Sequence, residues 1–201
     1  MAYSTITKPG LYFNTKLYSG DSSPSGSGTQ SVTGVGFQPD WTWLKSRSAG
    51  FNHRLFDAVR GAGKNLSSNL TDAEQSVDEG VTAFNTDGFS VKQGGSIEAN
   101  NSSHTYVSWN WKASGSTATN SNGSVSCTQS LNATAGFSLF KWTGTGSGEV
   151  SIGHGFSTAP KMWFVKSLSS GNWFVYTTII DGSLDYLHLH NTNAKADSSA
   201  T

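Results

Sequence analysis

The sequence has little of what several common classes of protein require. Its single cysteine, Cys127, excludes an internal disulfide framework. Charged residues make up 13% of the chain, about half of the usual share, and 13 basic and 13 acidic side chains give a formal net charge of zero. No run of Lys and Arg is present. The clustered positive charge that nucleic-acid binding needs is therefore missing.

Long apolar segments are also missing. No stretch approaches the roughly 20 apolar residues of a membrane-spanning helix. The first five residues have neither the charged start nor the apolar centre of a secretory signal. We therefore expect a protein that binds neither nucleic acid nor membranes and that is made in a cytoplasm.

Aromatic and small polar residues take the place of these features. Aromatics reach 12% of the chain, with seven Trp, and a few such side chains supply much of the area that a core must bury. Gly, Ser and Asn favour short strands joined by turns. Apolar side chains alternate with polar ones at residues 41–46, 105–111, 137–140 and 173–176. These patterns predict an all-β, antiparallel β-sandwich, with its tryptophans in a core or an interface.

An internal repeat organises the chain. The segment Gly34–Ser46 recurs as Gly153–Ser167, with two extra residues before the shared proline. The period of about 120 residues is typical of a small domain. We assign residues 1–14 to an N-terminal docking segment, 15–113 to a first β-sandwich unit, 114–134 to a Ser/Thr/Asn-rich linker and 135–201 to a second, incomplete unit. Alternatively, Asn122-Gly123 closes a hairpin across the linker.

Four motifs carry a resemblance to a known family, and they are Gly36–Lys45, His53–Gly61, Phe84–Phe89 and Tyr106–Ala113. They resemble the repeated modules of tail-fibre-like and other virion proteins of marine bacteriophages. The resemblance implies a concanavalin-like or jelly-roll sandwich on the virion surface, with no catalytic activity. It also implies other virion proteins and further copies of the chain as partners, a trimer being one such homo-oligomer. The lack of a signal peptide agrees with assembly in the cytoplasm of a host.

The densest polar cluster is the candidate ligand or interface site. It comprises His53, Arg54, Asp57 and Arg60. Guanidinium groups grip anionic sugars well, so one interpretation is a glycan contact that includes Trp173. The other is an Asp57–Arg54 or Asp57–Arg60 pair that fixes a loop or a subunit contact. The second interpretation is favoured, because the second copy of the repeat lacks the cluster.

Motifs for catalysis or metal binding are weak. The acidic residues are scattered rather than paired for glycoside hydrolysis, and no nucleophile elbow is present. The segment Asp181–Asp185 is the one candidate Ca²⁺ loop, and we interpret it as a plain turn. We interpret His188 and His190 as exposed strand residues. No catalytic residue, cofactor or metal is predicted.

Three functions follow in order of preference. The first is a non-catalytic virion structural protein, such as a tail fibre, an appendage or a capsid decoration. The second is a glycan-binding adhesin that recognises a host surface polysaccharide. The third is a polysaccharide depolymerase.

Overall fold

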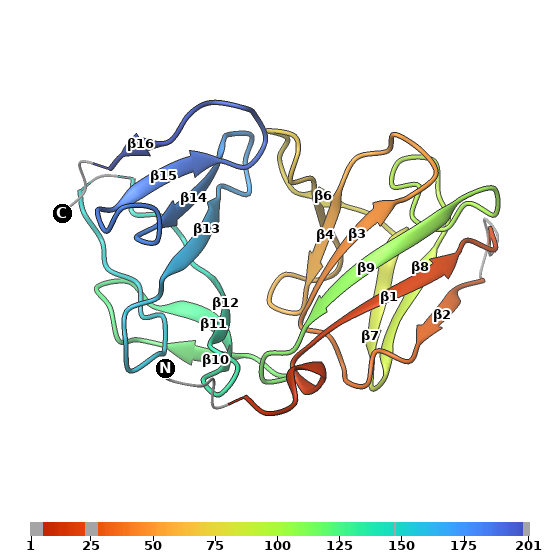
Figure 1. Cartoon of the computed structure of the whole chain (residues 1–201), viewed down its shortest axis with the longest axis horizontal. Coiled ribbons are helices and arrows are strands. Elements are labelled where there is room, and N and C mark those ends of the chain that lie inside the picture. The colour runs from red at the N-terminus through yellow and green to blue at the C-terminus, as the bar shows by residue number, and fades with distance from the viewer. Residues whose placement is uncertain (1–5, 23–27, 147, 199–201) are drawn as a thin grey trace.

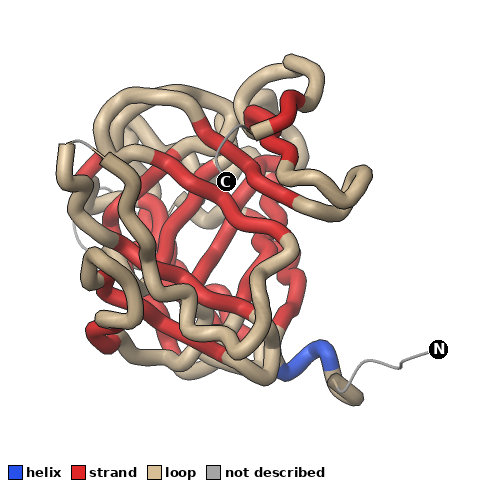
Figure 2. The backbone as a smooth tube through the Cα atoms, turned by 90° about the vertical axis from the view of Figure 1, so that its left-hand side faces the viewer, coloured by secondary structure: helices blue, strands red, loops and turns tan. Residues whose placement is uncertain are grey.

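The computed structural model describes residues 6–22, 28–146 and 148–198 (Figure 1). In these residues the chain forms sixteen strands and one short 3-10 turn, η1 (Pro9–Leu11), which lies next to the N-terminus (Figure 2). All the strand ladders are antiparallel, and the sheets are open. The prediction of an all-β, sandwich-like architecture is therefore confirmed. No helix in the described part of the chain is both long enough and apolar enough to span a membrane.

The largest sheet has six strands. Their spatial order is β1 (Phe13–Ser19), β9 (Thr105–Trp111), β3 (Trp41–Ser46), β4 (Arg54–Asp57), β5 (Gly61–Leu66) and β6 (Gln75–Ser76). Strand β9 pairs with β1 on one side and with β3 on the other, so it joins segments that are distant in the sequence. The predicted boundary after residue 14 falls inside β1, because Phe13 and Asn14 already pair with β9.

A smaller sheet covers one face of the large one and completes the sandwich. It consists of β2 (Gln30–Thr33), β8 (Gly88–Lys92) and β7 (Gly80–Asn85), and the predicted Asp-Gly turn joins β7 to β8. The large sheet contributes Leu44 and Phe56 to the core between the two layers, and both are buried. The small sheet contributes Val32, Val81, Phe89 and Val91.

Four of the seven tryptophans lie on the opposite face of the large sheet. Trp41 and Trp43 pair directly with Trp111 and Trp109, so all four share this face. Their alternation was predicted correctly, but the side chains that enter the sandwich core are those between them, such as Leu44. The Trp41 ring stacks at 4.5 Å on Trp111 and at 5.9 Å on Phe137 from the second half of the chain. The tryptophans therefore form an interface between the two halves.

The second half contains two further sheets. One consists of β10 (Ala118–Asn120), β11 (Cys127–Asn132) and β12 (Phe137–Lys141). The other consists of β13 (Met162–Lys166), β14 (Trp173–Thr177), β15 (Asp185–His188) and β16 (Ala196–Asp197). Figure 1 shows both to the left of the large sheet. The contact of Trp41 with Phe137 places β12 on the tryptophan side of that sheet.

The segment 114–134 is not the linker that its composition predicted, because it contains β10 and β11. The two strands form a hairpin around Asn122-Gly123, which was the alternative prediction. Buried polar side chains explain the misleading composition. Gln129 is buried, yet it bonds to Asn120 and to Ser138, so a polar residue occupies an interior position without an unpaired group.

Two sets of contacts fasten the halves together. At one end, the carboxylate of Asp40 is fully buried and accepts hydrogen bonds from the Ala113 and Gly115 amides and from the Ser130 hydroxyl. At the other end, Trp173 packs in a buried cluster with Leu55 and Leu66.

The repeat is visible in the strand pairs β3–β4 and β13–β14. In both, a lysine near the end of the first strand closes the following turn. Lys45 Nζ donates to the Ser46 and Ala49 carbonyls, and Lys166 Nζ donates to the Ser167 and Ser169 carbonyls. The copies differ in what surrounds the pair, because β7, β8 and β9 have no counterparts among the described residues of the second copy. In the first copy β9 joins β1 to β3. Without such a strand, the corresponding strands β12 and β13 belong to different sheets.

Candidate functional site

The predicted polar cluster runs from His53, just before β4, through Arg54 and Asp57 in β4 to Arg60 in the turn that follows. Each of these residues bonds to other groups of the protein. Arg60 forms ion pairs with Asp57 and with Glu74, and its side chain is only 7% exposed. It also donates to the Leu55 carbonyl. The structure thus contains the Asp57–Arg60 pair that the sequence allowed, and this pair closes the turn between β4 and β5.

The remaining members of the cluster point elsewhere. Arg54 faces the sandwich side, where it donates to Ser67 Oγ and to the Ser96 carbonyl, and burial lowers its pKa. His53 Nδ1 accepts a hydrogen bond of 2.8 Å from Trp43 Nε1. Burial lowers the pKa of His53, and the nearby charge of Lys45 lowers it further. The structure therefore does not bring His53, Arg54 and Arg60 together as one surface patch.

Trp173, the fifth candidate, is a contact between the halves. Its side chain is buried, and its Nε1 donates to the Ser67 carbonyl at 2.9 Å. His188 and His190 lie beside it, and their Nδ1 atoms contact the backbone oxygen and nitrogen of Trp173, respectively. Both imidazoles are thus occupied within the fold.

A continuous row of aromatic side chains covers one face of the sheet β13–β16. Directly paired residues of an antiparallel sheet share a face, so Trp163, Tyr176 and Tyr186 lie together, as do Phe174 and His188. The Trp163 and Tyr176 rings stack at 5.6 Å, and the Phe174 and Tyr176 rings stack at 6.0 Å. We call this the aromatic face.

The aromatic face is the counterpart of the core face of the first unit. In the repeat, Trp163 corresponds to Thr42 and Tyr176 to Phe56. Trp163 is directly opposite Tyr176 in its sheet, as Thr42 is opposite Phe56 in the large sheet. Thr42 and Phe56 are fully buried, because the sheet β2–β8–β7 covers them. Trp163 and Tyr176 are only half-buried.

The free edge of β13 is a second incomplete feature. Lys161 and Thr178 are bonded across the ladder with β14, so by alternation Met162 and Phe164 turn their backbone groups away from β14. They correspond to Trp41 and Trp43, which pair with β9. No described strand pairs with this edge of β13, and Met162 and Phe164 are 48% and 39% exposed.

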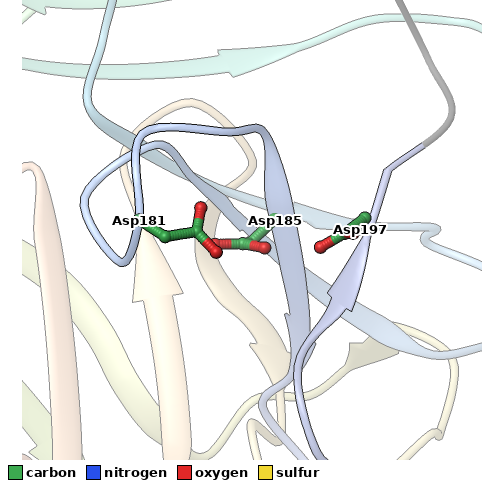
Figure 3. A group of neighbouring side chains, drawn as sticks. All are labelled: Asp181, Asp185 and Asp197. Atoms are coloured by element: carbon green, nitrogen blue, oxygen red, sulfur yellow. The ribbon is translucent and has the colours of Figure 1, made fainter.

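Three carboxylates meet at the end of the same sheet that carries the turn between β14 and β15 (Figure 3). Asp181, Asp185 and Asp197 have ligand oxygens that all lie within 4.8 Å of one another, and among the described residues this is the one such group of three metal-ligating side chains. Lys195 Nζ forms an ion pair with each of them. The hydrogen bonds that Lys195 donates hold the pKa of Asp181 well below its usual range. Donation to Asp181 and Asp185 in turn raises the pKa of Lys195.

The sequence alone indicates only part of this carboxylate cluster. The spacing of Asp181 and Asp185 makes that segment a candidate Ca²⁺ loop, whereas nothing local connects Asp197 and Lys195 to it. Pairing of β15 with β16 places Asp197 directly opposite Asp185, and no local pattern signals that register.

These features define a class of all-β protein with one two-layered sandwich and a further four-stranded sheet that carries a half-buried aromatic face. The chain belongs to the family described as a domain of unknown function, DUF7483, whose profile matches residues 8–201. No curated protein and no solved structure matches the chain.

Proposed function

We propose that this chain is a non-catalytic structural protein of a phage virion surface, which acts by docking to other polypeptides through its second unit. The single observation that carries the proposal is the aromatic face. It repeats the face on which the first unit builds its core, but with half-buried rings where Phe56 is fully buried. Covering such a face with a further layer stabilises a sandwich by about 25 cal/mol for each Å² of apolar surface removed from water.

The open edge of β13 supports the same proposal. An unpaired strand edge is a ready template for a strand from another chain. Met162 and Phe164 hold the positions at which the first unit receives β9, and a strand added there would extend the sheet in the same way. Copies of this chain and neighbouring virion proteins are the proposed partners, in agreement with the resemblance of the sequence to virion modules.

Mass measurement in solution tests the docking. Light scattering coupled to size-exclusion chromatography should give an oligomer for the wild-type chain. Met162→Lys at the open edge and Tyr176→Lys on the aromatic face should both shift it to the monomer, because a buried lysine charge opposes docking. Met162 is preferred to Phe164 at this edge, since the Phe164 ring contacts Trp41 of the same chain. Ile180→Lys is the matched control, since Ile180 is 50% exposed in a turn and outside any strand.

Location on a particle is tested separately. Phage particles are purified by density-gradient centrifugation from a lysate that contains this protein. Mass spectrometry should then detect the protein in the band of intact particles. Its recovery only in the fractions of unassembled protein, together with a wild-type monomer at all concentrations, would contradict the proposal.

A glycan-binding adhesin is the second candidate, and the aromatic face is also the observation that favours it. Stacked rings with hydroxyl and imidazole groups between them offer both the apolar and the polar contacts that a sugar uses. Retention of the chain in a gel containing host polysaccharide should then fall for Tyr186→Ala and persist for Trp142→Ala, a variant just outside the three-stranded sheet β10–β12. Equal migration with and without polysaccharide would rule this candidate out.

A further inference from the structure

The carboxylate cluster of the second unit holds more negative charge than its one lysine balances. Lys195 Nζ lies 2.7 Å from Asp181 Oδ2, 2.6 Å from Asp185 Oδ1 and 3.2 Å from Asp197 Oδ1. Three carboxylates against one ammonium group leave two negative charges in a region whose oxygens span at most 4.8 Å. Like charges at this spacing repel one another unless a further cation reaches them.

An orphaned oxygen at the centre of the cluster is the second, independent sign of a missing ligand. The Asp185 side chain has no exposed surface, and its Oδ2 has no hydrogen-bond partner. Figure 3 shows the Asp185 carboxylate between those of Asp181 and Asp197, with its two oxygens directed toward these neighbours. A buried carboxylate oxygen without a donor is costly, since it has lost its hydration and gained nothing in return.

We propose that Asp181, Asp185 and Asp197 form a calcium site, in which the ion takes the orphaned Oδ2 of Asp185 as a ligand and displaces Lys195 toward solvent. The two exposed aspartates complete the protein ligands, and water supplies the rest of the shell. Asp181 and Asp197 are 47% and 81% exposed, so water reaches the site from that side. Lys195 is itself 35% exposed, so part of its side chain already contacts solvent.

Calcium fits the spacing better than magnesium does. Calcium binds oxygen at about 2.3–2.6 Å, so oxygens on opposite sides of the ion lie roughly 4.6–5.2 Å apart. Magnesium binds at about 2.0–2.1 Å and demands a regular octahedron, which brings opposite ligands to roughly 4.2 Å. Oxygens that lie within 4.8 Å of one another fall inside the span of a calcium shell, whereas any pair farther apart than about 4.2 Å would have to close for magnesium.

Lys195 acts in this proposal as an internal competitor. Its ammonium group contacts all three carboxylates and stands in for the ion when calcium is scarce. Lys195 is only two residues from Asp197 in the sequence, so its ammonium group is present at the site at a high effective concentration. Calcium must compete with this tethered ammonium group to bind. Removal of the ammonium group should therefore tighten calcium binding, whereas removal of a merely structural lysine would only weaken the fold.

Calorimetric titration and thermal unfolding of the chelator-treated chain test the site. We expect one calcium ion per chain, and a calcium-dependent rise of about 2–4 °C in Tm that sodium chloride of equal ionic strength does not reproduce. Lys195→Met should bind calcium at least about tenfold more tightly, the equivalent of about 1.4 kcal/mol. Its lowered Tm in chelator should recover when calcium is added.

Two variants at exposed positions keep the test free of folding defects. Asp197→Asn should lose the calcium response, while Asp78→Asn should retain it. Asp78 is the matched control, because it is also exposed and also pairs with a lysine, Lys92, but stands outside any carboxylate cluster. Absence of calcium binding in both the wild type and Lys195→Met, or an equal response in Asp197→Asn, would overturn the proposal.

Discussion

The buried ion pairs around Arg60 show what the candidate cluster does for stability. The Arg60 and Asp57 side chains are only 7% and 11% exposed, so water cannot solvate either charge if its partner is removed. We expect Arg60→Met to lower the free energy of unfolding by about 3–5 kcal/mol, measured by urea denaturation. Lys92→Met is the control, because its partner Asp78 is 93% exposed. The control should cost less than about 1 kcal/mol.

His53 gives the protein a residue-scale dependence on pH. Its pKa in the folded protein lies below the usual value, because burial and Lys45 oppose its charge. The unfolded chain thus binds a proton at a higher pH than the folded chain does. Stability from this residue is present above the ordinary histidine pKa of about 6.5 and is lost as the pH falls from there through the lowered pKa.

The corresponding measurement compares unfolding curves at pH 7.5, roughly one unit above the ordinary histidine pKa, and at successively lower pH. Wild-type protein should lose more stability over this range than His53→Gln, which keeps a polar partner for Trp43 Nε1 but does not titrate. Parallel curves for the two proteins would contradict the assignment of a neutral His53 in the fold.

At the scale of elements, the hairpin β7–β8 depends on one glycine. Gly88 has a φ of +133°, and a Cβ placed there would lie 2.0 Å from the Val32 carbonyl oxygen. Gly88→Ala should therefore be destabilising by at least about 1–2 kcal/mol, since both the backbone conformation and the close approach of β2 exclude a side chain. Gly95→Ala, where a Cβ meets no atom within 4 Å, should change the midpoint of urea unfolding little.

Strands whose pattern is aromatic were predictable, and strands whose pattern is polar were not. Alternation of Trp41, Trp43 and Leu44 identified β3, and the Asp-Gly pair identified the β7–β8 turn. Strand β11 looks like a linker, because its interior positions hold Gln129 and Ser130, whose hydrogen bonds form only after folding. The carboxylate cluster escaped for a similar reason, as Asp197 reaches Asp185 through a strand pairing that no local signal specifies.

At the scale of the whole molecule, the choice of face was the harder question. Alternation shows which side chains lie together, but both faces of the large sheet are covered, one by β2–β8–β7 and the other by contacts with the second half. Large aromatics suit either position. A sequence pattern alone thus places Trp41 and Leu44 on opposite faces without deciding which faces the sandwich core.

The joint between the halves leads to a prediction for the molecule as a unit. Asp40 is fully buried and binds two backbone amides and the Ser130 hydroxyl, which fastens β10–β12 to the sandwich. Asp40→Asn replaces one charged acceptor oxygen by a donor, so it should cost about 1.5–3 kcal/mol. The loss of stability should be confined to the contacts between the halves. Amide hydrogens of β11 and β12 should then exchange faster than those of β3 and β9.

Asp87→Asn separates this effect from a general loss of stability. Asp87 also accepts two backbone amides, from Gly34 and Gly36, but all three residues belong to the first sandwich. This variant should speed amide exchange in β2 and β8. The ratio of the exchange rates of β11 and β12 to that of β3 should stay as it is in the wild type. Uniform acceleration across both halves in Asp40→Asn would mean that the halves unfold only together. The Asp40 contacts would then contribute to one cooperative core instead of a separable joint.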